Sequence, residues 1–158
     1  MEFTSVNKLY QEAFKKNWDR PAISNYHGET LHYKDVARRM EKLHIMFEEC
    51  GLEKGHKVAI CSRNQANWAV TFLAIMTYGA VPVPLLHEFK SANIHHLVNH
   101  SEAKILFVDD VIWEGLSESE MPDLQAIIQV NTFKILYAAD ERIVKAKNHL
   151  NELFGRKY

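Results

Sequence analysis

The feature that most constrains the fold of this chain is a series of short, nearly continuous apolar segments separated by longer stretches with helical periodicity. The apolar segments are residues 57–62, 80–86, 104–109 and 124–130. Strands that are apolar on both faces are typical of parallel sheets covered by helices. The sequence therefore predicts an α/β fold: a mostly parallel sheet with helices on both faces and right-handed crossovers.

Apolar residues between these segments recur at three- and four-residue steps, as on one face of a helix. The clearest helix covers residues 35–50, with an apolar stripe of Val36, Met40, Leu43, Phe47 and Cys50. Gly51 then supplies the left-handed residue that favours a helix end. Four further helices are predicted: residues 5–16; 65–78, capped by Asn64 and apolar almost all round; a helix from Ser91 through Val98; and 140–154, ended by Gly155.

The chain begins differently from the alternating part. Residues 22–26 and 30–33 have strand character, and Gly28 lies in the turn between them. An N-terminal helix and a β-hairpin are therefore expected to precede the sheet. Residues 115–121 are acidic and predicted to form a loop.

Length and charge exclude several classes of protein. The 158 residues suit one compact domain, residues 1–158. Nineteen basic and twenty acidic residues give a formal net charge of −1, without a basic face for nucleic acid, so no nucleic-acid partner is expected. The two cysteines, Cys50 and Cys61, have neither metal-ligand spacing nor a disulfide pattern, and we expect them to be reduced and at least partly buried.

Neither a signal peptide nor a transmembrane segment is predicted. The N-terminus has no basic stretch leading into an apolar one. The longest apolar stretch, residues 66–84, contains polar residues, a glycine and two prolines, and is too interrupted to span a bilayer.

Five segments in the same order and spacing resemble the start of the adenylate-forming superfamily, which includes acyl-CoA synthetases, peptide-synthetase adenylation domains and luciferases. They are LHYKDV (31–36), GLEKGHKVAI (51–60), NQANW (64–68), AIMTYGAVPVPL (74–85) and KILFVDD (104–110). Each segment alone is weak evidence of kinship, because its residues can also be explained by their roles in helices, turns and strands. Together they cover about half of the chain, and AVPVPLL and KILFVDD are most similar to long-chain fatty acid–CoA ligases.

The resemblance implies an ATP-dependent ligase that activates a fatty acid as an acyl-adenylate and passes it to the thiol of CoA. ATP, Mg²⁺ and CoA are thus the cofactors implied for the intact enzyme, which is expected in the cytoplasm or peripherally at the membrane. The family's Ser/Thr/Gly-rich phosphate loop, its ribose-binding Asp, its metal-binding Glu and its late Lys are not found in this sequence. The chain is therefore expected to be an inactive N-terminal subdomain, truncated before the phosphate-binding loop, with no catalytic, cofactor-binding or metal-binding residue of its own.

Two local patterns could suggest other sites. GLEKGHK (51–57) resembles a phosphate loop, but it is predicted to follow a helix and precede a strand, the reverse of the order that such a loop requires. His96 and His100 are four residues apart on a predicted helix, which suits a zinc site, but the sequence offers no third ligand, and a solvated helix face explains them better.

One residue is predicted to line a ligand pocket in the intact enzyme. His87 follows the strand at residues 80–86, and the carboxyl ends of strands are where α/β folds bind ligands. The alternative is an ordinary loop position.

An alternative to the enzyme fragment is a stand-alone α/β module that binds a ligand or partner on the same scaffold, because fold does not determine function. For the fragment, loss of the remaining enzyme should expose apolar surface and a sheet edge, so self-association as a dimer is expected.

Overall fold

A computed structural model, which describes residues 5–157, confirms the α/β fold with a mostly parallel sheet. The five strands lie in the order β4-β3-β5-β6-β7. They are β3 (Lys57–Cys61), β4 (Val81–Leu85), β5 (Ile105–Val108), β6 (Ala126–Gln129) and β7 (Ile135–Ala138). The first four are mutually parallel, whereas β7 runs antiparallel to β6.

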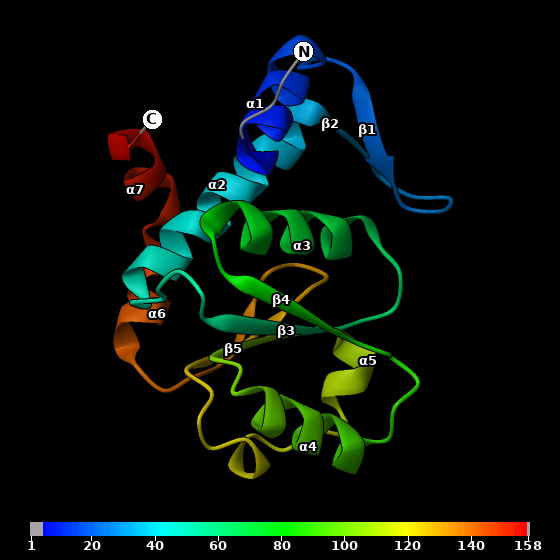
Figure 1. The fold of residues 1–158 in the computed structure, drawn as a ribbon, viewed down its shortest axis with the longest axis vertical. Helices are drawn as coiled ribbons and strands as arrows, with labels where there is room; N and C mark the ends of the chain where they lie inside the picture. The colour runs from blue at the N-terminus through cyan, green and yellow to red at the C-terminus, as the bar shows by residue number, and fades with distance from the viewer. Residues whose placement is uncertain (1–4, 158) are drawn as a thin grey trace.

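The helices cover both faces of this sheet, as predicted (Figure 1). The helices α2 (Tyr33–Glu49) and α3 (Ala66–Tyr78) pack on one face, and α4 (Ser91–Ser101) packs on the other. The short helix α5 (Asp110–Trp113) and the 3-10 turn η1 (Glu118–Glu120) lie in the connection from β5 to β6. The last helices, α6 (Glu141–Asn148) and α7 (Leu150–Lys157), pack against α2.

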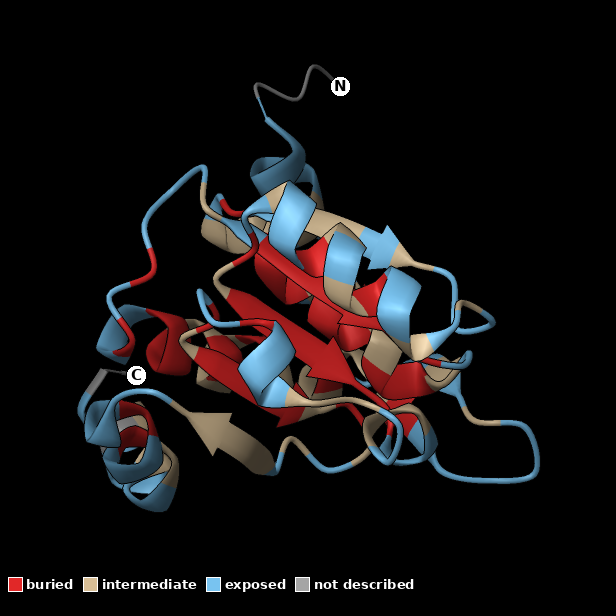
Figure 2. Ribbon diagram, turned by 90° about the horizontal axis from the view of Figure 1, so that it is seen from below, coloured by how far each residue is buried: buried red, intermediate tan, exposed pale blue. Residues whose placement is uncertain are grey.

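The sheet separates two apolar cores, and its strands supply side chains to both. The buried residues lie along the central strands and on the helix faces that cover them (Figure 2). In β3, Val58 and Ile60 face the core beneath α2 and α3, whereas Ala59 and Cys61 face the core beneath α4. All four are fully buried, which explains why β3 reads as a continuous apolar run.

The N-terminal helix and hairpin are also present. The helix α1 (Val6–Lys16) is capped by the hydroxyl of Ser5, which accepts a hydrogen bond from the Lys8 amide at 3.2 Å. The strands β1 (Pro21–Ser24) and β2 (Thr30–His32) form a separate antiparallel pair. Among the described helices, none is long and apolar enough to cross a membrane.

The helix α2 begins at Tyr33, two residues before the predicted start, so Tyr33 belongs to the helix and not to the preceding strand. At this start the Asp35 carboxylate accepts a hydrogen bond from the His32 amide at 2.9 Å. At its end Gly51 has φ 72°, and the Leu52 amide donates to the Phe47 carbonyl at 2.9 Å, which closes a Schellman motif. The segment GLEKGHK is therefore a helix end and a turn before β3, in the order that the sequence indicated.

Three helix predictions need correction. Asn64 does not cap α3, because the Asn25 side chain of the hairpin accepts the hydrogen bond from the Ala66 amide at 2.7 Å. The predicted helix at 140–154 is two helices that meet at His149, so that α7 turns to pack on α2. Gly155 does not end the second helix, which continues to Lys157.

The helix α3 is also less buried than its composition predicts. Its buried residues are Ala66, Asn67, Val70, Thr71, Ala74 and Ile75. Trp68 and Phe72 are half-buried and stack with ring centroids 5.4 Å apart, so they pack at the margin of the core.

Two features are absent from the sequence prediction. The hairpin from β6 to β7 has no Gly or Asn turn signal at its left-handed position, which Phe133 occupies with φ 58°. The acidic segment at 115–121 is mostly a loop, but it contains η1 and ends at Met121, which is 1% exposed and packs in the core beneath α4.

The strand β4 forms one edge of the sheet and contains two prolines. Its Val81 amide donates to the His56 carbonyl, toward β3, at 2.8 Å. Alternate residues of a strand point their amides the same way, so the amide positions of Pro82 and Pro84 face away from β3. Neither proline has an N–H group, which suits an edge strand.

Candidate functional site

The candidate site lies at the carboxyl end of the sheet, between β3 and β5. After β3 the chain continues into α3, which covers one face of the sheet. After β5 it continues into α5 on the opposite face, where Ile112 packs against the core beneath α4. Ligands of open α/β sheets bind at such a switch point. Here Arg63 lies two residues beyond β3, and Asp109 lies one residue beyond β5.

Arg63 and Asp109 form an ion pair across this point. The guanidinium Nε of Arg63 lies 3.0 Å from Asp109 Oδ2, and the Arg63 amide donates to the same oxygen at 2.9 Å. The other oxygen, Oδ1, accepts from the Ile112 amide at 2.8 Å and caps α5. Asp109 is fully buried, whereas the side chain of Arg63 is half-exposed.

The electrostatics of the pair follow from these contacts. Burial alone would raise the pKa of Asp109, but the hydrogen bonds from the Arg63 and Ile112 amides and the guanidinium outweigh it, so the pKa lies below its ordinary value. The pKa of Arg63 is raised, first by its hydrogen bond to Asp109 and also by the charge of Asp109. Both groups are therefore fixed in their charged forms.

A chain of amide side chains extends the network toward α2. The Asp110 amide donates to Asn131 Oδ1 at 3.2 Å, and Asn67 Nδ2 donates to the Asn131 carbonyl at 3.0 Å. Asn67 Oδ1 in turn accepts from Arg39 at 2.7 Å, and Arg39 also pairs with Glu29 of the hairpin at 2.6 Å. The network holds the hairpin, α2, α3 and the ends of β5 and β6 in one arrangement.

This arrangement positions loops and offers no nucleophile or general base. The hydrogen-bonding capacity of Asp109 and Asn67 is used within the protein. Cys61, at the end of β3, is the nearest thiol, and burial raises its pKa to about 11; burial likewise raises the pKa of Cys50 to about 12. Both cysteines are free and buried, as predicted, and thiols with such pKa values are inert near neutral pH.

His87 lies just beyond β4, at the carboxyl end of the sheet, as its position in the sequence required. Its side chain is 43% exposed, and its Nε2 lies 3.8 Å from the Glu88 carboxylate. It lines neither of the two cavities described below. A role in substrate binding stays a prediction.

His96 and His100 lie on the solvated side of α4, with ring centroids 5.9 Å apart. His95 accepts a hydrogen bond from the Ser117 amide at 3.1 Å and so holds the loop after α5. Within residues 5–157, no group of three or more His, Cys, Asp or Glu side chains could hold a metal ion.

An open groove of about 820 Å³ lies between α1 and α2. Tyr10, Phe14 and Trp18 line one side, and Met40 and His44 of α2 line the other. Most of the groove surface is apolar. No residue of α1 is buried, so apolar side chains of this helix line the groove and stay partly accessible. No motif in the sequence had indicated this groove.

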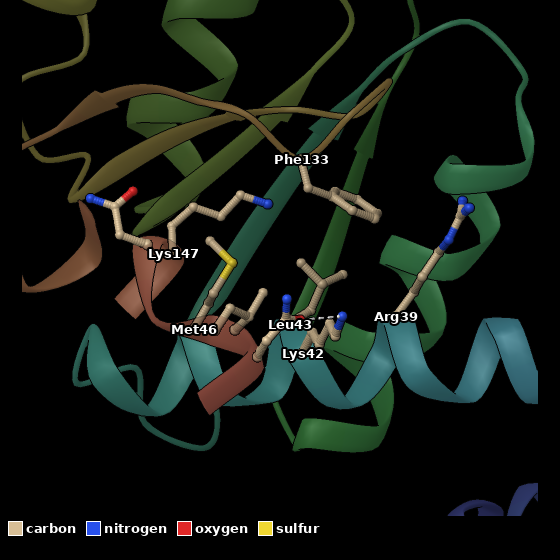
Figure 3. Close-up of a pocket in the computed structure, with 9 residues that line it drawn as sticks. Arg39, Lys42, Leu43, Met46, Phe133 and Lys147 are labelled. Atoms are coloured by element: carbon tan, nitrogen blue, oxygen red, sulfur yellow. Dashed lines mark hydrogen bonds between the residues drawn. The ribbon is translucent and has the colours of Figure 1, made fainter. Parts of the chain in front are cut away.

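A smaller cavity, of about 220 Å³, lies between α2, α6 and α7 (Figure 3). Three cationic side chains line it: Arg39 and Lys42 from α2, and Lys147 from α6. Phe133 and Leu43 supply part of its apolar wall. Sequence reasoning did not find this cavity, because α2 and α6 are distant in the chain and share no motif.

Comparison with known proteins identifies the family. The family described as AMP-binding enzyme matches residues 10–153, which is most of the chain. The chain belongs to the AMP-binding enzyme family. This result confirms the resemblance to adenylate-forming enzymes at the level of the superfamily.

The relatives of this AMP-binding chain include both acyl-CoA ligases and peptide synthetases. It is 24% identical over 134 residues to a medium-chain fatty-acid–CoA ligase of Escherichia coli, which covers 80% of the chain and 24% of that protein. It is 23% identical over 108 residues to surfactin synthase subunit 2 of Bacillus subtilis, which covers 68% of the chain and 3% of that protein.

Solved structures show the same fold. A long-chain-fatty-acid–CoA ligase from Archaeoglobus fulgidus superposes with a TM-score of 0.71 at 22% identity, over 89% of this chain and 29% of that one. The AMP-binding chain therefore spans less than a third of the length of each relative named here.

Proposed function

We propose that this chain is the N-terminal subdomain of an ATP-dependent long-chain fatty acid–CoA ligase. The intact enzyme would join a fatty acid to AMP with release of pyrophosphate and then transfer the acyl group to the thiol of CoA. ATP, Mg²⁺ and CoA are its proposed cofactors. The observation that carries the proposal is the family match over residues 10–153, together with fatty acyl-CoA ligases among the relatives.

The chain's own part in this reaction is structural. Adenylation depends on positioning and on positive charge at the phosphates. Arg63 is half-exposed at the switch point, but its guanidinium is held by Asp109 and Asp110 at 3.0 and 3.1 Å. We therefore assign the catalytic and cofactor-binding residues to sequence beyond this chain and propose that the chain alone is inactive.

Among the residues present, His87 is the one proposed to contact the substrate pocket of the intact enzyme. It lies at the carboxyl end of the sheet and is accessible. We also propose a cytoplasmic location, with the intact ligase free to associate peripherally with membranes.

The first experiment is calorimetric titration of this chain with ATP and Mg²⁺, and separately with a fatty acyl-adenylate analogue. No heat from either ligand is expected. Saturable binding at micromolar concentration would place a nucleotide or acyl site within these residues and contradict the assignment.

The ligase assignment itself is tested on the protein with its downstream sequence. Fatty-acid-dependent exchange of pyrophosphate into ATP, strongest with long chains, is expected. Exchange that depends on an amino acid instead would favour a peptide-synthetase adenylation domain and reject the fatty acid as substrate.

We further propose that the isolated chain self-associates as a dimer. Apolar side chains are accessible on its N-terminal part, including Val6, Leu9 and Trp18, which are 50%, 41% and 41% exposed. Light scattering over a wide range of concentration should show a mass above that of the monomer. A constant monomer mass would refute self-association.

A further inference from the structure

The cavity between α2, α6 and α7 has an unusual balance of charge. Among its nine lining residues are three cationic side chains and no acidic one. One cation is compensated, because Arg39 pairs with Glu29 at 2.6 Å and donates to Asn67. Lys42 and Lys147 remain as the sources of positive charge.

Lys147 lies half-buried and points into the cavity (Figure 3). No hydrogen bond or ion pair joins its ammonium group to any residue in the range 5–157. Burial, and secondarily the charge of Lys42, lowers its pKa. An ammonium group in this position is less well solvated than one in water, and nothing in the described protein compensates for the difference.

Within residues 5–157, the partners of the Lys42 ammonium group are uncharged. Its Nζ donates to Asn151 Oδ1 at 2.9 Å and lies 5.8 Å from the centre of the Phe154 ring. An amide oxygen and an aromatic face stabilise a cation without neutralising it. The two lysines therefore direct their uncompensated charge at the same small volume.

The rest of the wall is apolar. Leu43, Met46, Phe133 and Leu150 line the cavity beside the lysines. Its volume of about 220 Å³ is below the roughly 300–1,000 Å³ of sites for drug-sized ligands. A fitting ligand is thus small, has one anionic end and has an apolar body.

We propose that this cavity is a binding site for a small organic carboxylate, whose acidic group lies between Lys42 and Lys147. Its apolar part contacts Leu43, Met46 and Phe133. Each lysine gains a charge-assisted hydrogen bond, and their mutual repulsion is relieved. This site goes beyond the proposed ligase function and does not depend on it.

The test is titration of the chain with hexanoate, followed by calorimetry and by NMR of the backbone amides that surround the cavity. Hexanoate is expected to shift the amides of residues 42–46 and 147–150 and to bind more weakly as salt is added. Two comparison probes are hexylammonium, with the opposite charge, and inorganic phosphate, which lacks the apolar body. Both should bind at least tenfold more weakly than hexanoate.

Two variants locate the site. Lys147→Met keeps most of the side-chain volume and should weaken hexanoate binding at least tenfold. Lys42→Met should also weaken hexanoate binding at least tenfold, and it tests the site if Lys147→Met is too unstable to titrate. Lys145→Met is the matched control, because Lys145 lies on the same helix, is 72% exposed and does not line the cavity.

Loss of binding in both cavity variants, with normal binding in Lys145→Met, supports the site. Absence of hexanoate binding, or equal binding by hexylammonium, overturns it. Phosphate binding as tight as that of hexanoate overturns the role of the apolar wall. Equal binding by Lys145→Met and Lys147→Met places the anion elsewhere.

Discussion

The buried carboxylate of Asp109 provides a sharp test of the structure, because its neighbour Asp110 is a natural control. Both contact the guanidinium of Arg63, at 3.0 and 3.1 Å. Asp109 is fully buried, whereas the side chain of Asp110 is 53% exposed. Asn replaces either carboxylate with nearly the same shape, so the comparison isolates the charge.

The expected cost of Asp109→Asn is about 2–3 kcal/mol. Asp109 accepts three hydrogen bonds from N–H groups of Arg63 and Ile112. Hydrogen bonds to a charged group contribute roughly 1.5–3 kcal/mol, against about 1 kcal/mol for neutral ones. The new NH₂ group also has to face an N–H donor, of either Arg63 or Ile112. The cost stays below the roughly 3–5 kcal/mol of breaking a fully buried pair, because Arg63 is half-exposed.

The assay is urea denaturation of the wild type, Asp109→Asn and Asp110→Asn at neutral pH, followed by circular dichroism. If the unfolding free energies of the three proteins fall with urea concentration at the same slope, the differences between their midpoints report differences in stability. Asp110→Asn should change the midpoint little, since exposed pairs contribute little. Equal effects of the two substitutions would refute the reasoning that burial decides the cost.

The pH dependence gives a second check on Asp109. The pKa of Asp109 in the folded protein lies below the ~3.9 of an unfolded aspartate. The contribution of the Asp109 charge to the stability of the fold is therefore complete above about pH 5, and it is lost as the pH falls through the pKa of the folded state. The difference in stability between wild type and Asp109→Asn should be constant from about pH 5 to 8 and shrink below about pH 4.

Two further outcomes are expected. At pH 8 iodoacetamide should label neither Cys50 nor Cys61 in the folded protein, because thiols with pKa values of about 12 and about 11 are almost wholly protonated, and mass spectrometry should show both labelled in urea. Gly79→Ala should lower the free energy of unfolding by about 1–2 kcal/mol or more, and Gly51→Ala should lower it less. Gly79 has φ 96°, and a Cβ there would lie 3.0 Å from the Lys54 side chain, whereas Gly51 has φ 72° and open space around its Cβ position. Thermal unfolding would rank the two.

The central strands were predictable because their environment makes them apolar on both faces. Residues of β3 and β5 are buried beneath helices on each side, and this burial on both faces leaves a continuous apolar run in the sequence. The strand β7 was not predictable in this way. Its four residues are only half-buried, and Phe133 takes the turn conformation that a glycine would have signalled.

The site depends on contacts that sequence order conceals. The segment that ends in Asp109 was recognised as a family strand, but its pairing with Arg63 requires β5 to lie beside β3, and β4 lies between them in the chain. The cavity formed by Lys42 and Lys147 depends on the turn at His149, where periodicity predicted a continuous helix. Local pattern thus predicts the elements, and packing between distant elements determines the site.

The prolines of β4 have a consequence for how copies of this chain can assemble. Their missing N–H groups leave the outer margin of the strand without donors at positions 82 and 84. A foreign strand that approached this margin could not form a regular ladder, so growth of the sheet into a continuous intermolecular ribbon, the route to amyloid, is blocked on this side. Dimers of the chain would therefore form without backbone pairing along β4.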